Sequence, residues 1–415
     1  MSPASQPALL VIGGAKPSQG MRCVRQAQTR GLRVVLLDSS DNLDSAPEIA
    51  AAADRVIRGP FDQPDACAEI ALEHASSEHF VGVFGWREYA MESVAAVAEA
   101  LGLPGNGRKA VATVRDKYAC REALRLAGFA QPCARRCSSL GDALEVVTGG
   151  GAGPWIVKPK DAMGSVGVGV VRGPADAARA YAALPERHRS DFLIEEFQSG
   201  TEYSAEGVFV EAQPQVITLT TKHLMEEADC FIERGHVIPA LLPEPASRRA
   251  RQVVEAALRA LGLVYGVFHV EFWIDGDRIV LGEVHVRPGG DYIHLMVELV
   301  TGLELYGLVY DQLIGRVPDP SGWRIQGGAA VLYFTPPAGR VVSIGDAAAV
   351  SRDPACVRLD LPLRPGDTVP AIRESEDRPG FVLARAEAPQ AAWTAAQRLH
   401  DMIDLRVLPE SAPSR

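Results

Sequence analysis

The chain has 415 residues and a mass of 44.4 kDa, a length that fits two or three domains and a core that needs no disulfide or metal to be stable. Apolar residues make up 47% and charged residues 23%, which is typical of a folded globular protein and argues against a disordered or fibrous one. Acidic residues outnumber basic ones by 52 to 42, and no basic tract interrupts them, so we expect neither nucleic acid nor an anionic membrane as a partner.

Nothing in the sequence predicts export or a membrane span. No apolar run approaches the roughly 18 residues that a membrane-spanning helix needs. The first residues have neither a basic region nor a long apolar stretch, so they do not resemble an ordinary secretory signal. The seven cysteines are an odd number in a long chain, and we interpret them as reduced thiols. We therefore expect a cytoplasmic protein.

Strands alternate with helices from the start of the chain, which predicts a parallel sheet with crossover connections. The predicted strands cover residues 9–12, 32–37 and 81–84, and an Ala-rich helix covers 91–101. Gly13-Gly14 follows the first strand and is a candidate phosphate cradle, but the dinucleotide-binding glycine pattern is absent. A tight turn over the sheet edge is the favoured interpretation. Residues 1–107 are thus predicted to form a Rossmann-like α/β domain.

The rest of the chain favours two further domains. A linker over 103–107 and a helix over 109–127 lead into longer strands whose spacing is typical of antiparallel pairing, and we assign an α+β domain to residues 108–326. Its predicted strands cover residues 155–158, 166–172, 192–197, 203–210 and 215–221. Residues 327–415 are predicted to form a small α+β domain. Its strands cover 329–334, 341–344 and 357–361, and its closing helix covers 391–402.

A glycine-rich loop and two lysines point to a nucleoside triphosphate. Lys158 closes an apolar strand, the loop over 163–169 follows it, and Lys117 lies in the preceding helix. Glycines let backbone N–H groups approach phosphate oxygens, and a lysine at an apolar strand end needs an anionic partner. Alone, the loop fits a glycine-rich hairpin equally well, and it is not a Walker loop because no Gly-Lys-Ser/Thr follows.

Acidic residues follow the next strand, at Glu195-Glu196 before Phe197 and again at Glu202. Carboxylates at a strand end can accept hydrogen bonds from an adenine amine or from ribose hydroxyls. Taken singly, each is also explained as the solvated end of a strand.

The strongest pattern is a hairpin of two alternating strands around residues 275–277. With a turn of three to five residues, Glu271 lies opposite Glu283 and His269 lies opposite His285, whereas a two-residue turn would shift the register and break this pairing. Opposed carboxylates destabilise a sheet unless a cation lies between them. The pattern therefore favours Mg²⁺ bridging phosphates. A zinc or iron site of two imidazoles and two carboxylates, or an exposed hairpin with coincidental acids, stays open.

In this order the motifs resemble the ATP-grasp superfamily. The matching motifs are Asp116-Lys117, Lys158-Pro159, the loop over 164–169, Glu195-Glu196-Phe197, Glu202, Glu271 and Glu283-x-His285-x-Arg287. Within the superfamily the chain is most similar to bacterial L-amino acid ligases of the bacilysin synthetase type, and residues 378–382 are similar to their C-terminal subdomain. The resemblance implies an ATP-grasp architecture and a homodimer. It also implies an ATP-dependent reaction that joins two amino-acid-like substrates through an acyl phosphate and releases ADP and phosphate.

The resemblance implies a role for each motif residue. ATP would be held by Lys117, Lys158, Ser165, Gly167, Glu195, Glu196, Phe197 and Glu202. Two Mg²⁺ ions, with Mn²⁺ as the alternative, would be held by Glu271, Glu283 and His285. The substrates would contact Glu233, His236, Arg287, Gly290 and Asp291, with Glu233, His236 and Arg287 acting in catalysis.

Three positions depart from the family pattern. His285 stands where the superfamily usually has Asn, which puts the metal preference in question. Asp291 stands where bacilysin synthetase has a tryptophan, so we expect a first substrate that is larger than alanine and polar. Asp291 either pairs with Arg287 or caps the following helix, or it accepts a hydrogen bond from a polar or cationic substrate side chain. Lys222 is either the phosphate-proximal lysine of the family or a surface charge at a strand end.

Two other functions stay open. Another ATP-grasp reaction, such as formyl or carboxyl transfer to a nucleotide or biotin, predicts an acceptor that is not an amino acid. A non-catalytic ATP-binding sensor needs adenine contacts but no paired metal carboxylates, and the chain has both Glu271 and Glu283.

Overall fold

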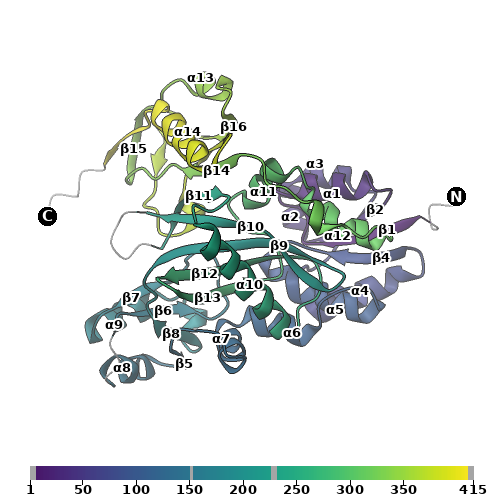
Figure 1. Ribbon diagram of the computed structural model, residues 1–415, viewed down its shortest axis with the longest axis horizontal. Helices are drawn as coiled ribbons and strands as arrows, with labels where there is room; N and C mark the ends of the chain where they lie inside the picture. The colour runs from purple at the N-terminus through teal and green to yellow at the C-terminus, as the bar shows by residue number, and fades with distance from the viewer. Residues whose placement is uncertain (1–5, 150–152, 226–230, 410–415) are drawn as a thin grey trace.

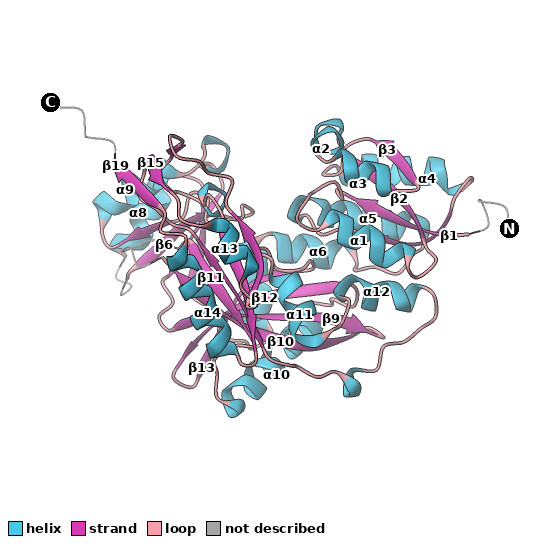
Figure 2. Cartoon of the chain, turned by 90° about the horizontal axis from the view of Figure 1, so that it is seen from above, coloured by secondary structure: helices cyan, strands magenta, loops and turns pink. Residues whose placement is uncertain are grey.

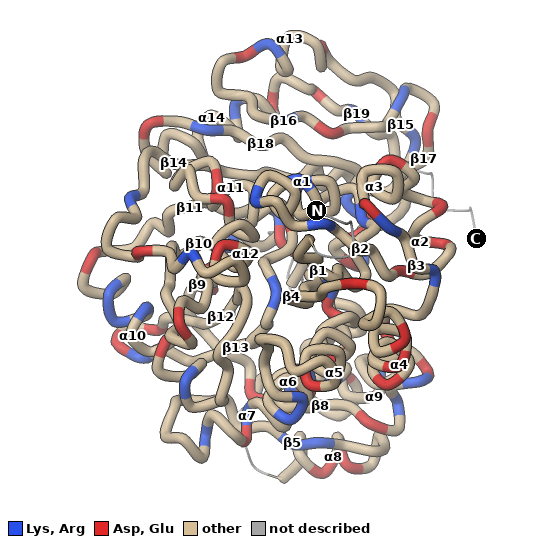
Figure 3. Tube along the Cα trace, turned by 90° about the vertical axis from the view of Figure 1, so that its right-hand side faces the viewer, with Lys and Arg blue, Asp and Glu red and all other residues tan. Residues whose placement is uncertain are grey.

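The computed structural model describes residues 6–149, 153–225 and 231–409. An N-terminal parallel sheet lies beside a long central sheet, and a small C-terminal sheet completes the chain (Figures 1 and 2). Basic and acidic residues are interspersed along surface helices such as α10 (Glu244–Ala260), as Figure 3 shows. The mixed α/β and α+β fold is as expected, whereas the proposed domain bounds stay predictions.

The N-terminal sheet is parallel, with strand order β3-β2-β1-β4, as the alternation of strands and helices predicted. Its strands are β1 (Pro7–Ile12), β2 (Arg33–Asp38), β3 (Arg55–Arg58) and β4 (His79–Phe84). Its helices are α1 (Gly20–Gln28), α2 (Ser40–Ser45), α3 (Pro47–Ala52), α4 (Pro64–Ala75), η2 (Glu88–Ala90) and α5 (Met91–Leu101). The interior strands β1 and β2 are almost wholly buried, because helices cover both faces of the sheet.

The prediction of a single helix over 109–127 is wrong, because this segment forms two helices, α6 (Arg108–Arg115) and α7 (Lys117–Leu126). Asp116 separates them, and its carboxylate accepts a hydrogen bond of 3.0 Å from the backbone N–H of Ala119 as the N-cap of α7. Lys117 is therefore the first residue of a helix.

A four-stranded antiparallel sheet of order β5-β8-β6-β7 carries the glycine-rich loop. Its elements are β5 (Ala134–Cys137), α8 (Leu140–Thr148), β6 (Trp155–Pro159), β7 (Gly169–Val171), α9 (Pro174–Ala183), η3 (Glu186–His188) and β8 (Phe192–Glu196). Strand β7 is shorter than the predicted 166–172, because Gly167 adopts a φ of +68°, which a regular strand does not contain.

The central sheet has eight strands in the order β13-β12-β9-β10-β11-β14-β18-β16. These strands are β9 (Thr201–Val210), β10 (Gln213–Leu224), β11 (Glu233–Ile238), β12 (Val267–Asp275), β13 (Arg278–His285), β14 (Gly328–Tyr333), β16 (Cys356–Asp360) and β18 (Phe381–Ala386). Helices α10, α11 (Ile293–Thr301) and α12 (Leu305–Leu313) accompany them. Because β14 pairs with β11, the C-terminal strands extend the central sheet.

The remaining C-terminal elements include two helices that pack on this extension (Figure 1). They are η4 (Pro320–Gly322), β15 (Gly339–Ser343), α13 (Ala347–Arg352), β17 (Thr368–Val369), η5 (Ser375–Asp377), α14 (Pro389–Met402) and β19 (Arg406–Pro409). Strands β17, β15 and β19 form a separate small sheet.

The hairpin β12–β13 joins two features that the sequence analysis treated as alternatives. Its turn has only two residues between the pair Asp275 and Arg278, yet His269 still lies opposite His285. A β-bulge reconciles them, because Gly282 and Glu283 together lie opposite Glu271. A Cβ atom at position 282 would lie 2.8 Å from the carbonyl oxygen of Glu271, so the bulge needs a glycine there.

Aromatic contacts join the N-terminal region to the central region. The ring of Phe84, at the end of β4, lies 5.6 Å from the Tyr306 ring and 5.4 Å from the Tyr310 ring, both on α12. All three rings belong to one hydrophobic cluster. Such packing fixes the carboxyl end of β4 beside the central sheet, where the candidate site lies.

Among the described residues, no single helix is long and apolar enough to cross a membrane. Helices α11 and α12 reach that length and composition only when taken together, and they are bent by 81°. The six described cysteines are free thiols, and Cys230 lies outside the described residues.

Candidate active site: two adjoining cavities

Two cavities of about 420 and 460 Å³ meet below the glycine-rich loop. We call the first the nucleotide cavity and the second the substrate cavity. Both are lined by Met163, Gly164, Val166, Lys222, Glu233, Glu271 and Glu283. The structure therefore gathers residues that are far apart in the sequence around one junction.

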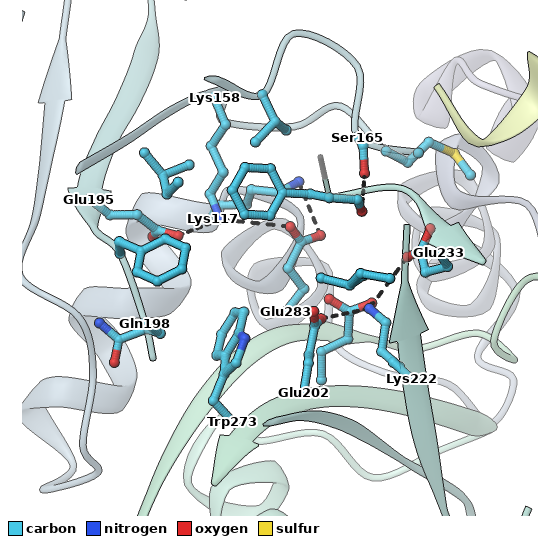
Figure 4. A pocket seen from close by; sticks show the side chains of 18 of the residues that line it. Lys117, Lys158, Ser165, Glu195, Gln198, Glu202, Lys222, Glu233, Trp273 and Glu283 are labelled. Carbon is cyan, nitrogen blue, oxygen red and sulfur yellow. Dashed lines mark hydrogen bonds and ion pairs between the residues drawn. The ribbon is translucent and has the colours of Figure 1, made fainter. Parts of the chain in front are cut away.

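Two lysines face one carboxylate at the inner end of the nucleotide cavity (Figure 4). The Nζ of Lys117 lies 3.2 Å from Glu283, and the Nζ of Lys158 lies 3.9 Å from it. Burial acts to raise the pKa of Glu283, but Lys117, His285 and Lys158 together hold it well below its usual range. Lys117 also donates to the carbonyl of Ala162 at 2.6 Å, which ties it to the loop. This end combines cations and a carboxylate as a bound metal–triphosphate needs.

Glu195, expected to contact adenine, is buried and already paired in the structure. It lies 2.5 Å from the Nζ of Lys158 and 3.0 Å from Arg121. Burial acts to raise the pKa of Glu195, but these two cations lower it to about 2, so the carboxylate is anionic at neutral pH. Arg121 was not predicted as a site residue. Its Nη1 also donates to the carbonyls of Leu281 and Gly282, the residues at the hairpin bulge.

The outer end of the nucleotide cavity is apolar and aromatic. Phe197 is 37% exposed, and its ring lies 6.3 Å from the ring of Phe231 across the cavity. Ile156, Trp273 and Glu196 line the same cavity. An apolar slot with flanking acceptors is typical of a purine site.

Lys222 binds three carboxylates where the two cavities meet (Figure 4). Its Nζ lies 2.6 Å from Glu202, 2.9 Å from Glu271 and 3.4 Å from Glu233. The alternative of a surface charge is therefore wrong. The pKa of Glu202 is raised to about 7, mainly by burial. Lys222 acts to lower it, and the negative charges of Glu271 and Glu233 act to raise it further.

The predicted metal ligands lie together, but they do not form a complete ligand set. Among the described residues no group of three or more His, Cys, Asp or Glu side chains is arranged to hold a metal ion. Burial acts to lower the pKa of His269, but Glu206, 2.9 Å from its Nδ1, raises it to about 9. The oxygens of Glu271 and Glu283 are suitable donors for Mg²⁺, whose other ligands come from phosphates and water.

The glycine-rich loop is held over the cavities by two hydrogen bonds. Ser165 donates to the carbonyl of Phe231 at 3.0 Å, and the carbonyl of Gly164 accepts from the N–H of Ser375 at 3.3 Å. Ser165 lines the nucleotide cavity as predicted, whereas Gly167 is not among its lining residues and faces Pro185.

Arg287 is fixed by a buried glutamate from the N-terminal region. Glu88, which is only 5% exposed, forms ion pairs with Arg287 and Arg115, and it lies 3.0 Å from Nδ1 of His285. The Nε2 of His285 lies 3.5 Å from Glu283 and is the ring nitrogen that faces the junction. Glu88 was not predicted, although an acidic residue just after a parallel strand was a usable signal.

Asp291 neither pairs with Arg287 nor caps the next helix, so both parts of that interpretation are wrong. Its two oxygens accept from Arg378 at 2.7 and 2.9 Å, and His236 Nε2 lies 3.0 Å away. Tyr292 is the N-cap of α11, with no side-chain bond. Arg378 also donates to the carbonyls of Ser375 and Glu233, and it lies 3.7 Å from the centre of the Tyr333 ring. Asp291 lines the substrate cavity, but its charge is already neutralised.

Most sequence-predicted residues thus line one of the two cavities. The substrate cavity brings together Glu233, His236, Glu271, Glu283, His285, Arg287, Gly290 and Asp291. Sequence reasoning missed Lys16, Glu88, Arg121 and Arg378. Arg378 lies within residues 378–382, which the family resemblance had singled out, and Lys16 lies two residues after Gly13-Gly14. Nothing local indicated that these N-terminal and C-terminal segments meet at one cavity.

Three family models match the chain. Residues 24–105 match the ATP-grasp N-terminal domain, residues 152–294 the ATP-grasp domain, and residues 332–408 the L-amino acid ligase C-terminal domain 2. The first two fall on the N-terminal sheet and on the nucleotide cavity. The third falls on the C-terminal region that supplies Arg378.

Individual proteins are also similar to this chain. An uncharacterised protein of Sinorhizobium fredii is 28% identical over 80% of this chain and 69% of its own length. A D-alanine–D-alanine ligase of Geobacter sulfurreducens is 28% identical over 57% of this chain and 75% of its own. The crystal structure of an L-amino acid ligase from Bacillus licheniformis superposes with a TM-score of 0.80, covers 98% of this chain and 100% of its own, and is 22% identical.

Proposed function

The chain belongs to the ATP-grasp superfamily and is an ADP-forming ligase, and from this premise we propose that it joins the carboxylate of one amino-acid-like substrate to the amine of another. The observation that carries the proposal is the junction of the two cavities. Lys222, Glu271 and Glu283 line both, so a γ-phosphate from one side and a carboxylate from the other meet there. The match to an L-amino acid ligase C-terminal domain supports amino acids over nucleotide or biotin acceptors.

The first step forms an acyl phosphate. A carboxylate oxygen of the first substrate bonds to the γ-phosphorus, and the bond between that phosphorus and the β–γ bridging oxygen breaks, which leaves ADP. We assign Lys117 and Lys158 to the phosphates, because both are cations at the inner end of the nucleotide cavity. Glu195, Phe197 and Glu202 are assigned to adenine and ribose.

Glu271 and Glu283 would hold Mg²⁺, with the Nε2 of His285 as the third candidate ligand. When bound, the metal neutralises charge on the transferred phosphoryl group. We propose that two Mg²⁺ ions bind here and that Mn²⁺ can replace them.

The second step forms the amide. The neutral amine of the second substrate bonds to the acyl carbon, the bond from that carbon to the phosphate oxygen breaks, and the proton lost by the nitrogen goes to the departing phosphate. We assign stabilisation of the tetrahedral oxyanion to Arg287, which Glu88 holds in place, and to His236, which Asp291 holds. Glu233 and Gly290 complete the substrate contacts.

Water must be excluded while the acyl phosphate exists, because water hydrolyses it. The loop over 163–169 covers the junction and is bonded to Phe231 and to the N–H of Ser375. We assign to it the role of a lid that opens for substrates.

A trapping experiment tests the function. The protein is incubated with Mg²⁺, ATP and single amino acids in the presence of hydroxylamine, which attacks an acyl phosphate to give a hydroxamate and phosphate. We expect a hydroxamate and equal ADP with at least one amino acid, and a dipeptide when a second amino acid replaces hydroxylamine. ADP formed only with bicarbonate or formate and a nucleotide or biotin would support the other ATP-grasp reaction. Cytoplasmic location and homodimerisation remain predictions. Light scattering, which measures the molar mass in solution, tests the second.

A further inference from the structure

One lysine of the substrate cavity has no counter-ion. Lys16 lies in the loop between β1 and α1 and lines this cavity with Ser18 and Gln19. Its ammonium forms no ion pair or hydrogen bond with the described residues. The three lysines of the nucleotide cavity differ in this respect, because each of them binds at least one carboxylate.

Lysine is rare in this chain, which makes its position informative. Only six of the 42 basic residues are lysines, and the rest are arginines. Three of the six line the nucleotide cavity, and Lys160 pairs with Asp191 at 2.9 Å. Lys109 and Lys16 are both exposed, but Lys109 lies on the surface of α6, whereas Lys16 lines the substrate cavity. Lysine is a flexible point charge, whereas arginine suits fixed bidentate pairs such as that between Arg378 and Asp291. Lys16 therefore stands where a mobile ligand is more suitable than a fixed partner.

The charged neighbours of Lys16 leave its charge uncompensated. These neighbours are Glu376, Arg87, Arg287 and Asp291. Arg287 is paired with Glu88, and Asp291 is paired with Arg378, so both are committed elsewhere. Arg87 donates to the carbonyl of Ala15 and adds positive charge. Glu376 attracts Lys16 but lies beyond ion-pair distance. Among the described residues, Lys16 is thus the lining cation of this cavity whose ammonium has no ion pair, and it lies near the arginine assigned to the tetrahedral oxyanion.

We propose that Lys16 binds the carboxylate of the second, amine-supplying substrate, so that this substrate is an amino acid or peptide with a free carboxylate and not a simple amine. This inference rests on the proposed function. The first substrate must reach the junction of the cavities and uses Glu233, His236 and Arg287. The second substrate then occupies the remaining part of the cavity, toward the N-terminal loop, and an ammonium there can receive its carboxylate in a charge-assisted hydrogen bond.

The test uses Lys16→Met with Lys109→Met as the matched control. Hydroxylamine replaces the second substrate and has no carboxylate, so hydroxamate formation should stay within about twofold of wild type in both variants. With the amino acid acceptor that wild type uses best, Lys16→Met should raise KM for that acceptor about 10- to 100-fold, the scale of one charge-assisted hydrogen bond. The carboxamide of the same acceptor should react equally well with wild type and Lys16→Met.

Each other outcome overturns the inference. An unchanged KM for the amino acid acceptor would exclude contact between Lys16 and the second substrate. A loss of hydroxamate formation in Lys16→Met as large as the loss of amide formation would assign Lys16 to the first substrate or to ATP. Absence of hydroxamate from wild type with every carboxylate would overturn the proposed function itself, and this inference with it.

Glu376→Gln separates this role from a purely structural one. If Lys16 only attracts Glu376 to close the cavity, the two single variants should change the acceptor KM in the same direction. If Lys16 binds a carboxylate, loss of the competing Glu376 should leave the acceptor KM unchanged or lower it.

Discussion

The two cavities are built in different ways from the same chain. The charged residues of the nucleotide cavity lie between Lys117 and Glu283 in the sequence, and each of its three lysines is paired with a carboxylate of the same cavity. The substrate cavity takes Lys16 and Arg378 from opposite ends of the chain, and Glu88 holds its Arg287 from the N-terminal region. A site for a ligand common to many enzymes is thus local and self-contained, whereas the site that distinguishes this chain is assembled by tertiary packing.

Replacing Arg121, which supports the nucleotide cavity, is expected to have the largest effect, a loss of stability. Arg121→Met leaves Glu195 buried with a reduced set of partners, and breaking a buried pair costs about 3–5 kcal/mol of unfolding free energy. Denaturant unfolding measures this change. Arg125→Met, one turn later on α7, removes only an exposed pair with Glu122 and should leave the midpoint unchanged. Equal midpoints for the two variants would contradict a supporting role for Arg121.

Removing a phosphate-facing charge should act on turnover. Lys158→Ala and Glu283→Ala should each lower the rate of ADP formation by about two to three decades, the effect of losing one preorganised charge contact. Lys160→Ala is the control, because Lys160 lies two residues away and pairs with Asp191. ADP formation near the wild-type rate in either site variant would remove that residue from the proposed site.

The substrate cavity should respond through KM for the first substrate. Asp291→Asn keeps the size of the side chain but weakens its bonds to Arg378 and His236. We expect KM for the carboxylate substrate to rise about tenfold, as for one charged hydrogen bond, and KM for ATP to stay constant. Because the charge of Asp291 is already neutralised, the loss should be similar for neutral and cationic substrates. A loss confined to cationic substrates would instead show a direct contact.

The smallest effect is expected at the boundary of the two cavities. Imidazole favours Mn²⁺ over Mg²⁺ relative to an amide oxygen, so His285→Asn should shift the ratio of Mn²⁺- to Mg²⁺-supported activity a fewfold toward Mg²⁺. Metal titrations of initial rate measure the ratio. Identical ratios in both proteins would mean that the ring of His285 does not bind the metal.

The same contrast explains how much of the molecule could be predicted. Apolar periodicity and glycine loops are local signals, and they were sufficient for the parallel sheet and the antiparallel strands. The roles of the ATP-binding residues come from the family resemblance and stay predictions. The hairpin β12–β13 has a feature that local sequence signals did not predict. The two-residue turn and the opposed histidines exclude each other in a regular ladder, and only the bulge at Gly282 allows both. Asp291 could not be paired correctly, because its partner Arg378 lies 87 residues away.

The pairing of β11 with β14 has a consequence for dividing this protein into parts. A fragment that ends before residue 327 would leave β11 at the edge of the sheet, with the backbone groups that now bond to β14 unpaired. An exposed, regular edge is a template for intermolecular strand addition. Exchanging the C-terminal region between related chains therefore means replacing a pairing interface, and a hybrid must match the register of His236 opposite Val331 to remain monodisperse.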